Sequence, residues 1–212
     1  MSNLKASLPT EHCATCPAFA QLEQMGIKVG DFDRVVALAG NPNTGKSTLF
    51  NALTGLKQHT GNWPGKTVTR AEGGYQFNGV RYKLVDLPGT YSLLAASQDE
   101  EVARDFILFG QPDCVIVVTD ATALERNLNL ALQVMEITDK VVIAVNLMDE
   151  ARRKGLEVEP RALSRELGVP AVPITARSGE GLSTLLQTVA GVIDGSIPTQ
   201  PRRTEGNPQF RT

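Results

Sequence analysis

The sequence has few cysteines, few aromatic residues and no large excess of charge of either sign. Three cysteines in 212 residues are too few, and an odd number, for a framework of disulfide bonds. The formal net charge of −2 argues against a strongly basic nucleic-acid-binding surface, so no nucleic-acid partner is expected. With 42% hydrophobic and 21% charged residues, the composition is that of an ordinary globular domain.

Long hydrophobic runs are also missing. The apolar stretches "VVALA", "CVIVV" and "VVIAV" have the length of strands, far short of the roughly 20 residues of a membrane helix. The N-terminus lacks the basic and then apolar pattern of a signal peptide. We therefore expect a cytosolic chain.

From Arg34 onward, strand-like and helix-like patterns alternate. Buried strands are predicted at "RVVALAG", "DCVIVVTDA" and "KVVIAVNLMD", and "GGYQFNGVRYKLVDLPG" predicts a hairpin that turns at Asn78-Gly79. A long loop is expected at 55–70, and short helices are expected in "CPAFAQLEQMG" and "EPRALSRELG". The alternation predicts an α/β fold with a mostly parallel, doubly wound sheet and helices on both faces.

The segment "GNPNTGKS" follows the first strand and precedes a helix. Its spacing Gly40-x-x-x-x-Gly45-Lys46-Ser47 matches the phosphate-loop motif in full. Glycines allow backbone N–H groups to surround a phosphate, the lysine adds positive charge, and the serine hydroxyl suits Mg²⁺. A nucleotide with Mg²⁺ is therefore the expected ligand.

The segment "NLMD" ends a later buried strand, where open α/β sheets bind ligands. The carboxylate of Asp149 can accept hydrogen bonds from the ring N1–H and the 2-amino group of guanine, whereas adenine offers no such pair. Asn146 can donate to the base and tie loops together, and Ala176 in "ITAR" can offer a backbone N–H to the guanine carbonyl. The combination favours guanine.

Two further segments are predicted to be nucleotide-dependent switches: the loop at 55–70, called the first switch here, and "DLPG". In "DLPG", Asp86 can hold Mg²⁺ through water and Gly89 can donate a backbone N–H to the γ-phosphate. Thr67 is either a second Mg²⁺ ligand or an ordinary strand-edge threonine. Trp63, the sole tryptophan, is either an exposed loop residue or a packed anchor. The predicted nucleotide-binding residues are Gly40, Asn43, Thr44, Gly45, Lys46, Ser47, Thr48, Thr67, Asp86, Gly89, Asn146, Met148, Asp149, Thr175, Ala176 and Arg177.

Together these motifs look like those of a translation-factor-related small GTPase. The wording "GNPNTGKSTLFNALTG", "GNWPGKTV", "DLPGTYSL" and "NLMD" more specifically resembles the cytosolic G domain of the FeoB family of bacterial ferrous iron transporters. The resemblance covers roughly residues 34–192. It implies a Ras-like P-loop GTPase that hydrolyses GTP slowly at the cytosolic face of the bacterial inner membrane, and it makes this chain a soluble fragment whose partner is the transporter's own membrane domain.

The resemblance also implies a role for K⁺. In many GTPases a glutamine after the D-x-x-G motif orients the attacking water, but here Thr90 stands there, and its side chain is too short for that part. We therefore expect intrinsic hydrolysis to be slow, or the water to be held differently. In potassium-activated GTPases an asparagine at the position of Asn43 holds K⁺ beside the phosphates, with carbonyls expected here from Gly61 and Trp63. From its residue type alone, Asn43 could equally be a turn-stabilising amide. The expected catalytic groups are Lys46, Asn43 and Gly89.

The expected division is an N-terminal extension at 1–32, a G domain at 33–195 and a linker or truncated tail at 196–212. The resemblance implies a helical domain after the G domain that slows GDP release; because the sequence after Gly195 shows no helical pattern, we expect that domain to be absent or reduced. In the extension, His12, Cys13 and Cys16 offer three ligands, one fewer than a closed zinc site uses. They form either a transition-metal or redox patch or a flexible arm with reduced thiols.

Two other functions compete with the transporter switch. One is a ribosome- or tRNA-associated small GTPase, which a basic RNA-binding appendage would favour. The other is a nucleotide-regulated interaction module in which hydrolysis is incidental. The sequence leaves the oligomeric state open, a homo-oligomer included.

Overall fold

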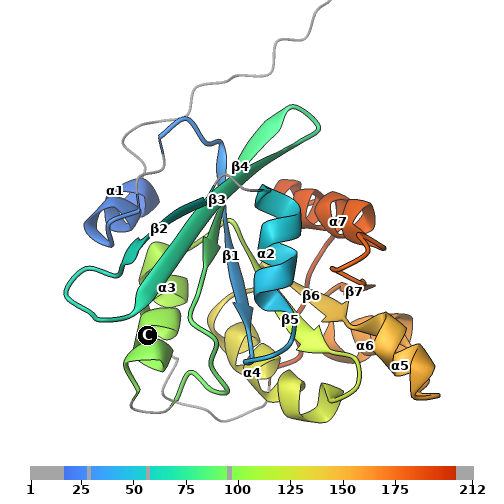
Figure 1. Cartoon of the computed structure of the whole chain (residues 1–212). Helices are drawn as coiled ribbons and strands as arrows, with labels where there is room; N and C mark the ends of the chain where they lie inside the picture. The colour runs from blue at the N-terminus through green and yellow to red at the C-terminus, as the bar shows by residue number, and fades with distance from the viewer. Residues whose placement is uncertain (1–16, 28–29, 56–57, 95–96, 204–212) are drawn as a thin grey trace, which may run out of the picture.

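A computed structural model describes residues 17–27, 30–55, 58–94 and 97–203 (Figure 1). Its sheet has seven strands in the order β2-β3-β4-β1-β5-β6-β7, antiparallel from β2 to β4 and parallel elsewhere. The strands are β1 (Arg34–Gly40), β2 (Gln58–Asn62), β3 (Thr69–Phe77), β4 (Val80–Asp86), β5 (Cys114–Asp120), β6 (Val141–Asn146) and β7 (Ala171–Pro173). The helices are α1 (Pro17–Gln24), α2 (Lys46–Thr54), α3 (Gln98–Gly110), α4 (Leu124–Ile137), α5 (Met148–Arg153), α6 (Pro160–Leu167) and α7 (Leu182–Asp194).

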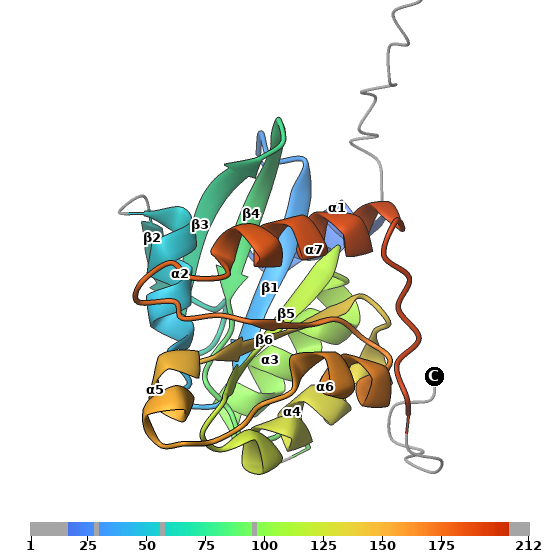
Figure 2. The same cartoon turned by 90° about the vertical axis from the view of Figure 1, so that its right-hand side faces the viewer.

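The sheet is covered by helices on both faces, as predicted. In β1, Val35 and Ala37 belong to a core that includes side chains of α3 and α4, whereas Val36 and Leu38 belong to a second core with α2 and α7 (Figures 1 and 2). Strands buried on both faces are apolar throughout, which explains runs such as "CVIVV". Cys114 is fully buried in β5, and this burial raises the pKa of its thiol to about 12.

The parallel strands fix the location of the site. Four neighbouring strands, β4, β1, β5 and β6, end at Asp86, Gly40, Asp120 and Asn146 on one edge of the sheet. The phosphate loop leaves β1 at this edge, and the "NLMD" segment leaves β6 there. Open α/β sheets bind ligands at this edge.

The expected hairpin is confirmed, but the long loop expected at 55–70 is wrong in part. Asn78 and Gly79 turn between β3 and β4 with positive φ angles of 50° and 81°. Within 55–70, residues Gln58–Asn62 form edge strand β2 on β3. This strand is polar and contains glycine, so its own sequence gives no strand signal, and its pairing comes from the neighbouring strand.

The described part of the expected tail, residues 196–203, is bound to the domain. The N–H groups of Gln200 and Arg202 donate to the carbonyls of Gly168 and Leu167, each at 2.9 Å, and Figure 2 shows this strap passing beside α6. Whether domain boundaries fall at 32/33 and 195/196 stays a prediction. In the described ranges no helix combines the length and apolarity required to cross a bilayer.

Candidate nucleotide-binding site

The phosphate loop is a tight turn that its two glycines make possible. A Cβ atom on Gly40 would lie 2.8 Å from the carbonyl oxygen of Val118. Gly45 has φ of 80°, and a Cβ there would lie 2.3 Å from Asn146 Nδ2. Asn43 also adopts a left-handed conformation, with φ of 67°, which asparagine tolerates better than most residues. The Thr44 hydroxyl donates to the Asn41 carbonyl at 2.9 Å and braces the turn.

A cavity of about 420 Å³ lies over this loop. Its lining residues are Asn41, Pro42, Asn43, Gly45, Lys46, Ser47, Thr48 and Gly89. Gly89 is part of this lining because the "DLPG" segment lies against the phosphate loop. The Thr90 N–H donates to the Gly40 carbonyl at 3.3 Å. The structure therefore brings together the predicted phosphate residues and the predicted γ-phosphate donor, at the N-terminus of α2, where helices bind anions.

Lys46 and Asp86 form an ion pair beside this cavity. The Lys46 ammonium also donates to the Leu87 carbonyl at 2.7 Å. Burial raises the pKa of the Asp86 carboxyl, and the neighbouring Lys46 partly offsets this by lowering it. The two charges predicted for phosphate and Mg²⁺ thus lie together, and each stabilises the other in a largely buried place.

Asn146 joins three loops of the site. Its side chain is 1% exposed; Nδ2 donates to the Thr44 carbonyl at 2.9 Å, and Oδ1 accepts from the Ala176 N–H at 3.0 Å. The expected tie between loops is therefore present. The Ala176 N–H, which we expected to be directed at the guanine carbonyl, is used in this tie instead.

Asp149 lies next to this tie, in the first turn of α5. One carboxylate oxygen, Oδ1, is buried and has no hydrogen-bond partner among the described residues, while Oδ2 lies 4.0 Å from Arg153 Nη2. The side chain as a whole is 40% exposed, so the carboxylate remains in reach of water, but Oδ1 itself lacks a donor and is suited to a ligand that brings N–H groups.

The other predicted base-side residues differ in exposure. Thr175 is buried, and its N–H and hydroxyl both donate to Glu180, at 2.9 Å and 3.2 Å. The Met148 N–H lies 3.4 Å from the Ile174 carbonyl, and Arg177 is exposed.

The predicted first-switch residues do not line the phosphate cavity. Thr67 is exposed, and its hydroxyl lies 3.1 Å from Gln98 Oε1. Gly61 is in β2, paired with Arg70. Trp63 is a packed anchor, 4% exposed, with its ring edge-on to Phe106 at 5.4 Å between centroids. Any Mg²⁺ or K⁺ contact from this segment requires it to move toward the cavity.

Sequence reasoning missed α3 and gave no role to Asn41. The signal for α3 was a capping box, because Ser97 accepts from the Glu100 N–H at 3.3 Å at the helix start. Asn41 is 1% exposed, and neither polar atom of its side chain has a partner among the described residues. We find no sequence signal that would have revealed this.

The predicted ligands His12, Cys13 and Cys16 lie outside the described residues. Within the described ranges, no group of three or more His, Cys, Asp or Glu side chains is arranged to hold a metal ion.

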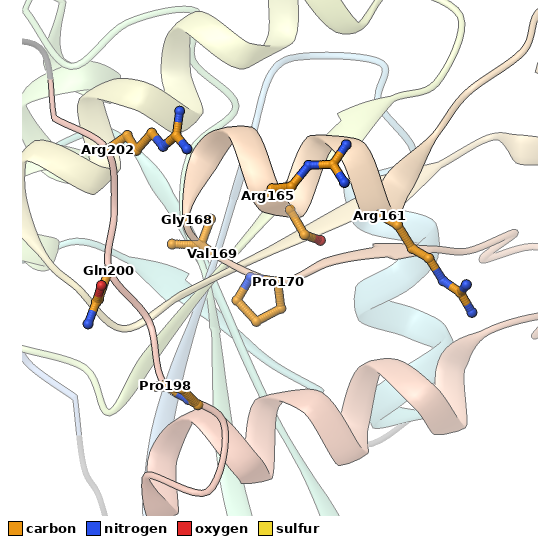
Figure 3. A pocket seen from close by; sticks show the side chains of 9 residues that line it. Arg161, Arg165, Gly168, Val169, Pro170, Pro198, Gln200 and Arg202 are labelled. Atoms are coloured by element: carbon orange, nitrogen blue, oxygen red, sulfur yellow. The ribbon is translucent and has the colours of Figure 1, made fainter.

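A larger hollow of about 720 Å³ lies between α6 and the strap (Figure 3). It contains none of the predicted site residues. Arg161, Arg165 and Arg202 surround it, but Figure 3 shows their guanidinium groups pointing in different directions. They form no common anion site, so the phosphate loop remains the candidate centre.

Comparison with known proteins gives consistent results. The family model described as ferrous iron transport protein B matches residues 34–189. The Fe(2+) transporter FeoB of Escherichia coli (strain K12) is 46% identical over 154 residues, which are 71% of this chain and 20% of that protein.

Two solved structures show the same similarity. The G domain of the T. maritima FeoB iron transporter is 44% identical, with a TM-score of 0.71 over 75% of this chain and 98% of that one. The cytosolic domain of the same transporter in a GDP form is 40% identical, with a TM-score of 0.77 over 84% and 70%. This chain spans about a fifth of the length of the curated relatives it matches.

Proposed function

The chain belongs to the ferrous iron transport protein B (FeoB) family as its N-terminal G domain, with a Ras-like P-loop fold, and from this premise we propose that it binds GTP and slowly hydrolyses it to GDP and phosphate. In the whole protein it acts as the switch of a ferrous iron transporter, on the cytosolic side of the membrane domain. A relative solved in a GDP form supports guanine nucleotides as the ligand.

One observation carries the choice of nucleotide: the buried Oδ1 of Asp149 has no donor among the described residues. The guanine ring N1–H and 2-amino group supply two donors to one carboxylate, which adenine cannot do. Asn146 fixes the distance between this carboxylate and the phosphate loop by holding Thr44 on one side and Ala176 on the other. The base and phosphate contacts are therefore parts of one prebuilt frame.

The phosphates occupy the cavity over Gly45, Lys46 and Ser47. The Lys46 ammonium moves from Asp86 and the Leu87 carbonyl, or shares its protons with them, to neutralise the outer phosphates. Gly89 lies in the cavity lining, where its N–H meets the γ-phosphate. Loss of that phosphate removes this contact and releases the segment that follows.

The oxygen donors fit Mg²⁺, which prefers hard oxygen ligands. Ser47 would hold it directly, Asp86 through water and Thr67 after movement of its segment. A bound Mg²⁺ neutralises charge on the phosphates.

Asn43 is the residue proposed to hold K⁺ beside the phosphates, completed by carbonyls of Gly61 and Trp63. Asn43 is exposed at the cavity, so its amide oxygen is accessible to a cation. Thr90 is only 4% exposed, so its hydroxyl is poorly placed to orient an attacking water. A cation that neutralises charge in the transition state is therefore a reasonable source of rate enhancement.

The test is hydrolysis by the purified chain of GTP and of ATP, each with Mg²⁺, in KCl and in NaCl. Asn43→Ala is compared with Asn129→Ala, an exposed asparagine on α4 outside the site. We expect GTP turnover to be faster in KCl, and Asn43→Ala alone to remove the difference. Equal rates in the two salts would eliminate the K⁺ proposal, and equal hydrolysis of ATP and GTP would eliminate the guanine assignment.

A further inference from the structure

The segment 17–27 precedes the residues matched by the family model, yet its end is part of the domain core. Leu22 is 3% exposed and Ile27 is fully buried, and both belong to the cluster that contains Trp63 and Phe106. Helix α1 packs against α3 (Figure 1), and its end at Gly26 approaches Pro64 and Arg70 beside the first switch. The N-terminal extension is thus in contact with the segment proposed to respond to GTP.

Helix α1 ends in a turn that fits the first switch closely. The Ile27 N–H donates to the Leu22 carbonyl at 2.9 Å, and Gly26 takes a left-handed φ of 77°, a common helix ending. A Cβ atom on Gly26 would lie 2.8 Å from Arg70 Nη1 and 2.9 Å from Pro64 Cγ. Only glycine lets the helix end approach the turn this closely.

Arg70 on β3 joins the helix end to Trp63. Its Nη1 donates to the Met25 carbonyl at 3.1 Å, and its guanidinium carbon lies 5.5 Å from the centre of the Trp63 ring. Its Nε is fixed by Glu72 at 2.7 Å. One rigidly held cation therefore contacts both the extension and the switch.

The switch turn itself is compact and attached to α3. The Lys66 N–H donates to the Trp63 carbonyl at 3.0 Å across Pro64-Gly65, and the Trp63 N–H donates to the Val68 carbonyl at 3.0 Å. The Lys66 ammonium pairs with Glu101 on α3 at 2.5 Å. The turn 63–68 is therefore braced by its own hydrogen bonds, with Trp63 held between the end of α1 and α3.

This docked position conflicts with the proposed role of the turn in binding GTP. Thr67 lies 3.1 Å from Gln98 on α3, and no residue of 61–68 is among those that line the described phosphate cavity. For Thr67 to reach Mg²⁺ on the γ-phosphate, the turn must leave α3 and take Trp63 away from the helix end. Contacts with α1 oppose that movement.

The packing between the end of α1 and the turn 63–68 is incomplete, which favours a reversible contact. A cavity of about 200 Å³ is bordered by Met25, Trp63, Pro64 and Val102, among others. The Trp63 Nε1 atom is buried and has no partner among the described residues. An unsatisfied donor and a void both reduce the stability of the docked position.

We propose that residues 17–27 form an intramolecular clamp that holds the turn 63–68 on α3 and so disfavours the GTP-bound arrangement. This inference rests on the proposed function. Because coupling between two sites is reciprocal, GTP must weaken the docking of α1 by the same factor by which docking weakens GTP binding.

The test uses the full chain and its sole tryptophan, Trp63, as the reporter. Leu22→Asp removes the buried anchor of α1, and Gln21→Asp, at an exposed position of the same helix, is the matched control. We expect Leu22→Asp to shift Trp63 emission to the red and to raise the ratio of affinities for a non-hydrolysable GTP analogue and GDP by about fivefold or more. The control should change neither quantity.

An emission shift in Leu22→Asp with an affinity ratio within about twofold of wild type would show that α1 only packs, and would overturn the clamp. If Leu22→Asp does not fold, amide hydrogen exchange of 17–27 in the wild type decides. Faster exchange with the GTP analogue than with GDP supports the clamp, and equal exchange overturns it. Failure of the wild type to bind either nucleotide would instead defeat the proposed function.

Discussion

The base side and the switch side of the candidate site are held by different kinds of contact. On the base side, Asn146 is almost fully buried and uses both ends of its amide to join neighbouring loops. On the switch side, Trp63 is packed in the core, but Thr67 and Lys66 are attached to α3 only by exposed pairs. Thr67 contacts Gln98, and Lys66, whose side chain is 30% exposed, pairs with Glu101, which is 44% exposed. Exposed pairs of this kind contribute little to stability.

The difference separates recognition from response. In the proposed function the carboxylate of Asp149 identifies guanine, and this requires a fixed frame because misplaced donors and acceptors lose their contacts. In the same proposal the turn 63–68 responds to the γ-phosphate, and this requires contacts that break at low cost. The same edge of the sheet provides both kinds of contact. Buried hydrogen bonds follow β6 and β7, and exposed side-chain pairs hold the turn between β2 and β3.

The largest expected effect is a loss of GTP affinity when Asp149, on the base side, is replaced. Asp149→Asn replaces two acceptor oxygens by one acceptor and one donor, so GTP affinity should fall by about 100-fold or more. Xanthosine triphosphate, which has a carbonyl where guanine has the amino group, should bind better to the variant than to the wild type. Competition binding of the two nucleotides measures this, with Glu150→Gln as the control. Unchanged preference would contradict the role of Asp149.

The next prediction concerns the two hydrogen bonds by which Asn146 joins the loops of the base side. Asn146→Ala leaves the Thr44 carbonyl and the Ala176 N–H unpaired in a buried place, so the free energy of unfolding should fall by about 3 kcal/mol. Urea unfolding without nucleotide measures this, and Asn129→Ala on the surface of α4 should leave it nearly unchanged. A small effect of Asn146→Ala would mean that the base side is no more rigid than the switch side.

The strap, residues 196–203, also belongs to the rigid part of the molecule, because it is hydrogen-bonded to the end of α6 next to β7. Gly168 has φ of 73°, and a Cβ there would lie 1.9 Å from the Gln200 carbonyl oxygen, whereas Gly179 has φ of 80° with open space around it. Gly179→Ala should therefore cost only the backbone strain of about 1 kcal/mol, and Gly168→Ala about 2 kcal/mol or more because the strap is also displaced. Thermal unfolding of both variants checks the difference; equal losses would show that the strap is loosely held.

The smallest expected effect is on the switch side. Thr67→Ala removes an exposed hydrogen bond to Gln98, so the free energy of unfolding without nucleotide should change by less than about 0.5 kcal/mol. With Mg²⁺ and a GTP analogue the same variant should lose part of the stabilisation that the ligand gives the wild type. Urea unfolding with and without the ligand separates the two. A large loss without ligand would remove the contrast between the two sides.

Local patterns in the sequence were sufficient for much of the fold. Asn78-Gly79 specifies a hairpin turn, and the run at Arg34–Gly40 followed by the phosphate-loop spacing specifies a strand, a turn and a helix. These elements could be predicted because their signals lie within a few residues of the structure that they determine. The polar edge strand Gln58–Asn62 could not, because its partner β3, rather than its own composition, makes it a strand.

The sequence by itself determined the residue types that the site needs: a phosphate loop, a carboxylate after β6 and a glycine after β4. Only the tertiary structure decided that the Ala176 N–H is committed to Asn146, that Lys46 rests on Asp86, and that Trp63 is wedged between α1 and α3. The reason is physical. Periodicity and turn chemistry act over short separations, whereas these contacts join residues tens of positions apart and depend on packing that no local pattern encodes.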